Sequence, residues 1–203
     1  MNKKAELEKL ILRQNSGLML KKLEALNQKI RNCKKCSLWK KRKNTVPGEG
    51  PPNTKIIFIG QNPGSTETKL GKPFVGMAGR FLNELFGIAG INRKKIFITS
   101  VLKCPTPKNR KPTKKEIKTC FPYLKEQIET INPKKFILLG EVAFSVFFPK
   151  KELSSFRGKW IKENGQEYFI TYHPAAGIRF LKFKKILEKD FRKLKRVNFD
   201  KLF

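Results

Sequence analysis

The sequence has few acidic residues, a single histidine and no long apolar run. Its 203 residues include 46 Lys and Arg against 16 Asp and Glu, so its formal net charge is +30. It contains no run of 18 apolar residues and no signal-peptide pattern, and we therefore expect a cytoplasmic protein that does not span a membrane. The phosphate-binding patterns GxxxxGKS/T and GxGxxG are also absent, which argues against a nucleotide hydrolase.

The cationic surplus predicts a polyanionic partner. Nucleic acid is the first candidate and an anionic membrane the second. A lysine-rich, solvated surface suited to a hot or salty cytoplasm would give the same composition without any ligand. The size of the imbalance favours nucleic acid. An RNA-binding module would share the charge, but the sequence has no RNP-type aromatic signature.

Strand-like and helix-like segments alternate along the chain. Short apolar runs predict buried strands at 55–59, 96–99, 136–140 and 168–171, and helices are predicted at 5–31, 77–88, from Thr113 onward and at about 180–196. We expect 15–17 to interrupt the first helix and Pro122 to kink or break the third, which a capping box formed by Thr113 and Glu116 begins. This alternation predicts an α/β fold with helices on both faces of a parallel sheet.

The loop at 60–76 is the strongest candidate for a binding site. It joins a predicted strand to a predicted helix, which is where open α/β sheets place their ligands. Its glycines allow close backbone approach, and it carries the polar residues Gln61, Asn62 and Glu67 and the aromatic ring of Phe74. A plain turn at Gln61 and Asn62, and a core position for Phe74, are the alternatives.

Four cysteines form a second candidate site. Cys33 and Cys36 make a C-x2-C pair, and Cys104 and Cys120 lie far downstream. Four thiolates can hold zinc or an iron–sulfur cluster, but a zinc ribbon normally uses a second short pair. Four unrelated buried cysteines are the alternative, and the position of the first pair beside a basic loop argues against it. Spacing alone favours a metal without choosing which one.

Taken together, the motifs resemble those of the family 4 uracil-DNA glycosylases over residues 25 to 195. The resemblance rests on C-x2-C, PGEGPPN, GQNPG, GKPFVG, TSVLKC, CFPYL, RGKW and YHPAA, which occur in that order. It implies a three-layer α/β/α sandwich around a central four-stranded, mostly parallel sheet. The length and composition favour one domain at 1–203, with an N-terminal helical segment at 1–31, over two small domains. It also implies a structural [4Fe–4S] cluster on Cys33, Cys36, Cys104 and Cys120, with zinc as the less favoured alternative.

The same resemblance implies a function in base excision repair. The chain would flip uracil out of single- or double-stranded DNA and hydrolyse it off, leaving an abasic site, and it would act as a monomer. Phe74 would stack on the base, Glu67 would lie near uracil C5, and His173 would bond uracil O2, with Gly60 and the main chain near Gln61 completing the pocket. A loop with Ala175, Ala176, Ile178 and Arg179 would form the wedge that enters the DNA.

Two positions depart from the family pattern. In GQNPG, Gln61 and Asn62 stand where the family has Glu and Ala or Gly, and the motif instead looks like the GINPG of mismatch-specific uracil and thymine glycosylases, in which Asn positions the attacking water. Ser100 replaces an Asn that reads the uracil edge, and a hydroxyl makes fewer simultaneous hydrogen bonds than an amide. We therefore expect looser base selection. A non-catalytic iron–sulfur protein that binds DNA or senses damage is the alternative.

Overall fold

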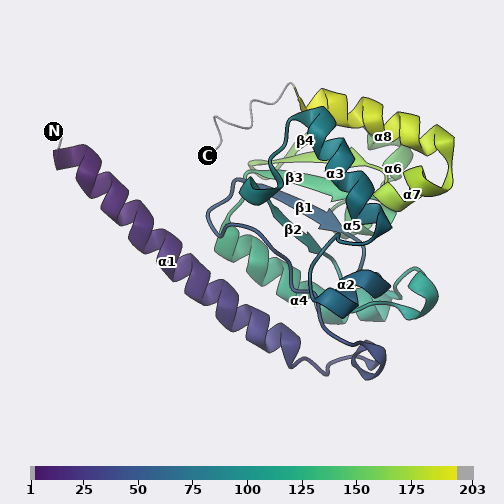
Figure 1. Cartoon of the computed structure of the whole chain (residues 1–203), viewed down its shortest axis with the longest axis horizontal. Coiled ribbons are helices and arrows are strands. Elements are labelled where there is room, and N and C mark those ends of the chain that lie inside the picture. The colour runs from purple at the N-terminus through teal and green to yellow at the C-terminus, as the bar shows by residue number, and fades with distance from the viewer. Residues whose placement is uncertain (1–2, 196–203) are drawn as a thin grey trace.

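The computed structural model describes residues 3–195 and places a twisted sheet between layers of helices (Figure 1). The five strands run in the order β2-β1-β3-β5-β4. Their bounds are β1 Ile56–Gly60, β2 Phe97–Ser100, β3 Lys135–Leu139, β4 Trp160–Glu163 and β5 Gln166–Thr171. The first three and β5 pair in parallel, and β4 pairs antiparallel with β5. The α/β prediction is confirmed, but the prediction of four strands missed β4.

The missed strand forms a hairpin with β5. Asn164 and Gly165 connect the two strands, and both have positive φ values, 52° and 73°. Two consecutive positive φ values are the mark of the tight turn that joins antiparallel strands, and Asn-Gly is the sequence most suited to it. The strand itself is short and half exposed, with only Trp160 and Ile161 apolar, so it lacks the buried apolar run that identified the other four.

Helices cover both faces of the sheet, as predicted. Their bounds are α1 Lys3–Arg31, α2 Ser65–Leu70, α3 Met77–Ala89, α4 Lys114–Ile131, α5 Glu141–Phe147, α6 Leu153–Phe156, α7 Pro174–Arg179 and α8 Leu181–Leu194, with 3-10 turns η1 Ser37–Lys41, η2 Arg93–Lys95 and η3 Pro107–Asn109. One core joins α3 and α8 to the sheet and includes Phe58, Phe86 and Phe191. The other joins α4 and α5 to the opposite face and includes Leu124 and Phe144. Successive strand residues therefore serve opposite cores, as the strand pleat requires.

Three predicted helix boundaries need correction. The first helix continues through 15–17, where Gly17 faces open space and costs about 1 kcal/mol relative to alanine, too little to end a long helix. The helix at α4 also continues through Pro122, so the predicted break is wrong, while a kink there stays a prediction. Pro122 is exposed, so water can bond to the carbonyl that the proline leaves without an N–H donor. The segment 175–179, which was expected to be a loop, is instead the short helix α7, because Pro174 and the His173 N-cap start a helical turn there. The helix predicted at about 180–196 is confirmed as α8, which follows the extended backbone of Phe180, and residue 196 lies outside the described residues.

The four parallel strands end at one edge of the sheet. Gly60 of β1 lies beside Ser100 of β2, and Leu139 of β3 lies beside Thr171 of β5. The loops that carry the predicted pocket residues therefore start from neighbouring positions. In the described part of the chain, none of the helices has the length and apolar character that a bilayer-spanning segment needs.

Candidate functional site

A cavity of about 390 Å³ opens at this edge of the sheet. That size is typical of a small-molecule pocket. The loop after β1, the end of β2 and the α7–α8 segment line it, with the side chains of Gln61, Asn62, Glu67, Phe74, Ser100 and His173 together with Ala175, Ala176, Arg179, Phe180 and Phe183. Every side chain that the sequence placed in the pocket is therefore brought into one cavity.

The predicted residues outside the lining are Gly60 and Ile178. Gly60 lies under the Phe74 ring, because a Cβ there would come within 2.6 Å of Phe74 Cζ. Ile178 is on the surface. Two apolar residues that the sequence analysis missed are even more exposed, since Phe180 and Leu181 show 59% and 68% of their surface. The sequence signal for them was an apolar pair at a break between two helices.

Phe74 is held in place by its backbone. Its φ of 49° is in the left-handed region, which is strained for a bulky side chain, and such strain occurs mainly at functional sites. Arg93 clamps the turn by donating hydrogen bonds to the carbonyls of Pro73, at 2.7 Å, and Phe74, at 3.1 Å. A Cβ on Gly79 would overlap the Phe74 carbonyl, so glycine is required there. The Phe74 ring is stacked 5.7 Å from the His173 ring.

The Glu67 carboxylate fastens the same loop at both ends. Its Oε1 accepts hydrogen bonds from the N–H groups of Val75 at 2.9 Å and Gly76 at 2.7 Å, and its Oε2 accepts one from Gly64 at 3.1 Å. Hydrogen bonds to a charged acceptor are about twice as strong as neutral ones. Glu67 lines the cavity, but three backbone donors already engage its oxygens. Its main structural effect is to fix the segment that presents Phe74.

The Gln61 and Asn62 amides bond to each other. Gln61 Nε2 donates to Asn62 Oδ1 at 2.8 Å, and Asn62 Nδ2 donates to the Pro63 carbonyl, also at 2.8 Å. The Gly60 and Gln61 carbonyls accept hydrogen bonds from the N–H groups of Val101 and Leu102. The main chain of the loop is therefore anchored to the segment that follows β2. The amide oxygen predicted to hold a water already accepts one hydrogen bond.

His173 is arranged as a neutral hydrogen-bond donor. Its Nδ1 accepts a hydrogen bond from the Ala175 N–H at 3.2 Å, as the N-cap of α7. This leaves the proton on Nε2. Burial, aided by the charge on Arg179, lowers the pKa of His173 to about 4, and the Glu67 carboxylate opposes the shift only in part. Gly140, with a φ of 89°, lets the chain approach closely, since a Cβ there would lie 2.9 Å from His173 Cβ.

Ser100 sits on a buried lysine that the sequence analysis did not identify as important. Lys103 exposes 1% of its surface, and its ammonium donates to the Ser100 carbonyl at 2.8 Å, Thr99 Oγ1 at 2.6 Å and Gln127 Oε1 at 2.7 Å. Three acceptors match the three protons of an ammonium group. Burial lowers the pKa of Lys103 to about 7. The only sequence signal was a lysine set between apolar residues and a cysteine.

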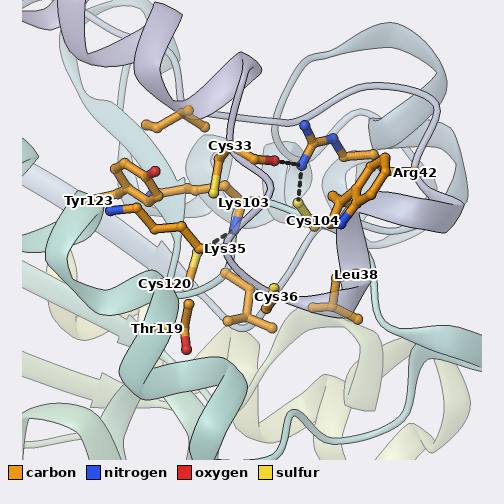
Figure 2. Close-up of a pocket in the computed structure, with 13 residues that line it drawn as sticks. Cys33, Lys35, Cys36, Leu38, Arg42, Lys103, Cys104, Thr119, Cys120 and Tyr123 are labelled. Atoms are coloured by element: carbon orange, nitrogen blue, oxygen red, sulfur yellow. Dashed lines mark hydrogen bonds between the residues drawn. The ribbon is translucent and has the colours of Figure 1, made fainter.

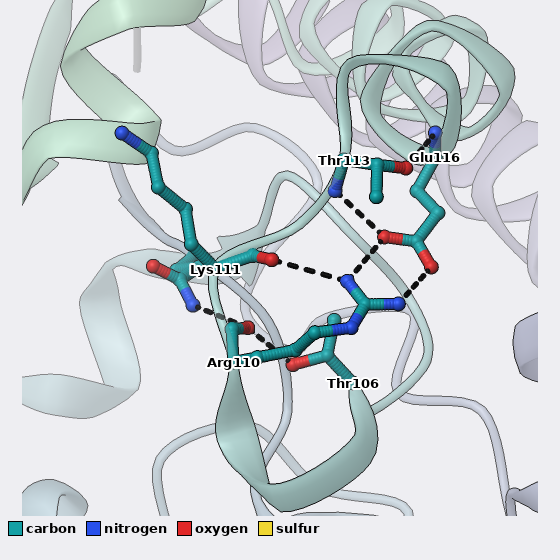
Figure 3. Close-up of polar contacts among 6 residues, drawn as sticks. Thr106, Arg110, Lys111, Thr113 and Glu116 are labelled. Atoms are coloured by element: carbon teal, nitrogen blue, oxygen red, sulfur yellow. Dashed lines mark hydrogen bonds and ion pairs between the residues drawn. The ribbon is translucent and has the colours of Figure 1, made fainter.

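The loop after β2 is tied to the start of α4 by Arg110 and Glu116 (Figure 3). The guanidinium makes two hydrogen bonds to the carboxylate, at 2.9 and 2.7 Å, and this pairing lowers the pKa of Glu116 to about 2. The capping box predicted from Thr113 and Glu116 is confirmed. The Arg110 carbonyl accepts hydrogen bonds from Thr106 Oγ1 at 2.6 Å and, more weakly, from Gln61 Nε2 at 3.5 Å. The firmly held loop thus reaches the pocket.

A buried ion pair contacts Thr171 and Tyr172, the two residues before His173. Asp190 of α8 is fully buried and accepts hydrogen bonds from Arg157 at 2.6 Å and from Thr171 Oγ1 at 2.8 Å. The Arg157 guanidinium also lies over the ring of Tyr172, the residue before His173. A Cβ on Gly158 would come within 2.6 Å of the Asp190 carboxylate. The Arg-Gly part of the RGKW motif is therefore explained by packing around one carboxylate.

The four cysteines meet beside α1 and α4, as predicted. Cys33, Cys36, Cys104 and Cys120 line one small cavity, and Figure 2 shows their sulfur atoms facing a shared space. Hydrogen bonds reach sulfur from the Lys103 N–H to Cys120 Sγ at 3.3 Å and from Arg42 to Cys104 Sγ at 3.4 Å. Over residues 3–195, however, no group of three or more His, Cys, Asp and Glu side chains is placed so that it could hold a metal ion. Burial raises the pKa of Cys120 to about 11, so a bare thiolate is disfavoured there.

The chain is similar to known proteins over most of its length. Residues 47–195 match the sequence profile of the uracil DNA glycosylase superfamily. The type-4 uracil-DNA glycosylase of Saccharolobus solfataricus is 45% identical over 183 residues, which cover 85% of each chain. Those of Sulfurisphaera tokodaii and Pyrobaculum aerophilum are 43% and 38% identical, and the matched regions cover 83% and 90% of the relatives and 85% and 84% of this chain. The chain belongs to the uracil DNA glycosylase superfamily and, within it, to the type-4 family.

Proposed function

We propose that this chain is a uracil-DNA glycosylase of DNA repair, which hydrolyses the bond between uracil and deoxyribose and leaves an abasic site. The observation that carries the proposal is a neutral His173 stacked beside Phe74 in a cavity of suitable size. The relatives that share the fold carry the name of this activity. The cationic surplus supports DNA as the substrate, because phosphate contacts dominate binding to nucleic acid.

In the proposed reaction, the base must first leave the duplex or single strand and enter the cavity. Phe74 offers it a fixed aromatic face. The bond between uracil N1 and the sugar C1′ then breaks, and its electron pair goes to the base, while a water oxygen bonds C1′. The proton that this water loses passes to solvent, and the departing uracil anion takes up a proton from solvent. His173 Nε2–H stabilises the charge that develops on uracil O2, because a fixed donor in a dry site needs no reorganisation. A protonated imidazole is not required for this role.

The attacking water needs a hydrogen-bond acceptor, and we assign that role to Asn62. Its Oδ1 accepts one hydrogen bond from Gln61, and the second lone pair of this oxygen can accept another from the water. An amide orients water but does not take its proton at neutral pH. Neither group adds a negative charge beside the cationic sugar. This chemistry supports a slower reaction than a carboxylate at position 61 would give.

Base selection depends on Ser100 and on the loop that Glu67 holds. At position 100 a serine hydroxyl stands where the family pattern has an asparagine amide. The loss of one hydrogen bond to the base is worth roughly 1–3 kcal/mol. We therefore propose that a deaminated purine such as hypoxanthine is also accepted. Glu67 fixes the segment that presents Phe74. Its expected position near uracil C5 is where the methyl group of thymine would clash.

The wedge is proposed at the junction of α7 and α8. Ala175 and Ala176 line the cavity and stay half-buried, so they suit contact with the flipped nucleotide. Ile178, Phe180 and Leu181 lie where α7 meets α8 and expose 44%, 59% and 68% of their surface, and Phe180 also lines the cavity. Glycosylases and other DNA-bending proteins insert side chains of this kind where a base has left the stack.

We further propose that the four cysteines hold a [4Fe–4S] cluster with a structural role, with zinc as the less favoured alternative. Four thiols facing one space, an N–H donor to Cys120 and the cationic Arg42 beside Cys104 all suit an anionic metal–thiolate centre. When bound, the cluster would tie α1, η1, the loop after β2 and α4 together. A brown protein with an absorption band near about 400 nm would support iron over zinc.

The decisive assay uses a labelled single-stranded oligonucleotide with one uracil, followed by alkali to break the abasic strand. We expect cleavage with the wild-type chain and a large loss with His173→Ala, while Lys162→Ala, a surface change on β4, leaves activity unchanged. Retention of uracil by the wild type, combined with binding of the oligonucleotide, would instead favour a non-catalytic DNA-binding protein. The departures from the family pattern at Gln61 and Ser100 are the observations that favour this second function.

A further inference from the structure

A second hollow lies next to the pocket and has no role in the reaction described so far. It measures about 520 Å³ and lies between η1, the start of α2 and the segment 105–110. Its lining includes Lys40, Lys41 and Lys108, together with the hydroxyl groups of Ser37 and Ser65. Asn109 lines both this hollow and the pocket. The two spaces are therefore neighbours, and we refer to the second as the lysine groove.

The charge of the lysine groove is unbalanced. None of its lining residues is acidic. Within residues 3–195, Lys40, Lys41 and Lys108 are exposed and enter no ion pair. Arg110 also lines the groove, but its guanidinium is already committed to Glu116. Three unpaired ammonium groups around one concave surface concentrate positive potential there, which favours a ligand with several negative charges.

The walls of the groove are fixed. Arg110 pins one wall to α4, and Thr106 closes the turn that carries Lys108 by donating to the Arg110 carbonyl at 2.6 Å. On the other wall, the Asn44 side chain, which follows η1, donates to the carbonyls of Thr68 and Lys69 in α2 at 3.0 and 3.1 Å. A site that is already formed loses less entropy when an extended ligand binds.

We infer that the lysine groove binds the sugar–phosphate backbone of the DNA strand on one side of the flipped nucleotide. This inference rests on the proposed function, because the pocket supplies the point from which the strand continues. Phosphates spaced along one strand would meet Lys40, Lys41 and Lys108 in turn, and the serine hydroxyls can donate to phosphate oxygens. The contacts read no base, so the groove contributes affinity and direction and leaves base selection to the pocket.

The test compares two triple variants that remove the same charge. One carries Lys40→Gln, Lys41→Gln and Lys108→Gln in the groove. The control carries Lys22→Gln, Lys162→Gln and Lys189→Gln, three exposed lysines of α1, β4 and α8. Binding of a uracil-free single strand is followed by fluorescence anisotropy at several salt concentrations. We expect the slope of log affinity against log salt to fall by about 2 for the groove variant, because each lost phosphate contact on single-stranded DNA removes about 0.7.

A second measurement tests direction. Uracil oligonucleotides are extended on the 5′ side alone or on the 3′ side alone, and kcat/KM for excision is measured for each. The wild type and the control should favour extension on one side by about tenfold or more, and the groove variant should lose that preference. Equal salt slopes for the two triple variants, or a directional preference that survives in the groove variant, would overturn the inference. If the wild type excised no uracil, the proposed function would fail and the anisotropy comparison alone would decide the groove.

Discussion

The pH dependence of His173 is the most direct consequence of the pocket geometry. Burial lowers the pKa of His173 to about 4 from the ordinary 6.5 of a histidine. At pH 5 about nine-tenths of the folded protein should then carry the neutral imidazole, against about one-thirtieth for an unshifted group. We therefore expect kcat/KM for uracil excision to stay nearly flat from pH 8 down to about pH 5 as far as His173 is concerned.

The same shift has a defined effect on stability. Between pH 6.5 and pH 4 the unfolded chain binds a proton at His173 and the folded chain does not. The free energy of unfolding therefore decreases as the pH falls through this window. A pKa lowered from 6.5 to about 4 corresponds to about 3 kcal/mol of stability when both states are fully neutral. Above pH 6.5 both states are neutral at this position and the contribution is complete.

The assay combines three measurements. Because His173 is the only histidine in the sequence, the imidazole proton resonances of a histidine-labelled sample report on it without further assignment. Denaturant unfolding is measured from pH 7 to pH 4. Over this range the free energy of unfolding should fall by about 3 kcal/mol less in His173→Gln than in the wild type. A titration midpoint near 6.5, together with a fall in kcat/KM at the same pH, would refute the assignment of His173 as a neutral donor fixed by the Ala175 N–H.

Three further predictions follow from the loops and the ion pair. Glu67→Gln places an amide NH2 group against one of the three backbone N–H donors that the carboxylate now accepts. It should lower the free energy of unfolding by about 2 kcal/mol in denaturant experiments and lower kcat in single-turnover excision assays. An unchanged unfolding midpoint would contradict this prediction. Ser100→Asn should raise the preference for uracil over hypoxanthine by about 5- to 150-fold in paired oligonucleotide assays, and an unchanged ratio would mean that the main chain reads the base. Asp190→Asn leaves Arg157 without its anionic partner and should cost about 3 kcal/mol or more in unfolding experiments, whereas Glu163→Gln on the exposed end of β4 should cost little.

The parallel part of the fold could be predicted because four strands are continuous apolar runs buried on both faces. β4 could not be found in that way because it is half exposed, although the Asn164-Gly165 turn beside it was a usable signal. From local preferences, 15–17 was predicted to interrupt the first helix and Pro122 to kink or break α4. The energies involved are small or are offset by solvent, so the helices continue.

The candidate site was predictable residue by residue where motifs existed, and it was incomplete where long-range pairing decides the outcome. The pocket side chains and the four cysteines follow from short motifs and from the resemblance. The partnership of Arg157 with Asp190 joins residues 33 positions apart, and the cage around Lys103 joins β2 to α4. Neither is encoded in a local pattern. The neutral state of His173 likewise depends on burial, which one sequence position does not reveal.

The segment from Ser100 to Cys104 gives the two sites a common foundation. The Lys103 ammonium donates a hydrogen bond to the Ser100 carbonyl, and the Lys103 N–H donates one to Cys120 Sγ. The next residue, Cys104, is itself one of the four cysteines. Whatever displaces those thiols, such as oxidation or alkylation, must therefore also shift the Ser100 carbonyl and the loop bonded to it. Chemical modification of the cysteines would then change the shape of the base pocket, even though no atom of that pocket had been modified.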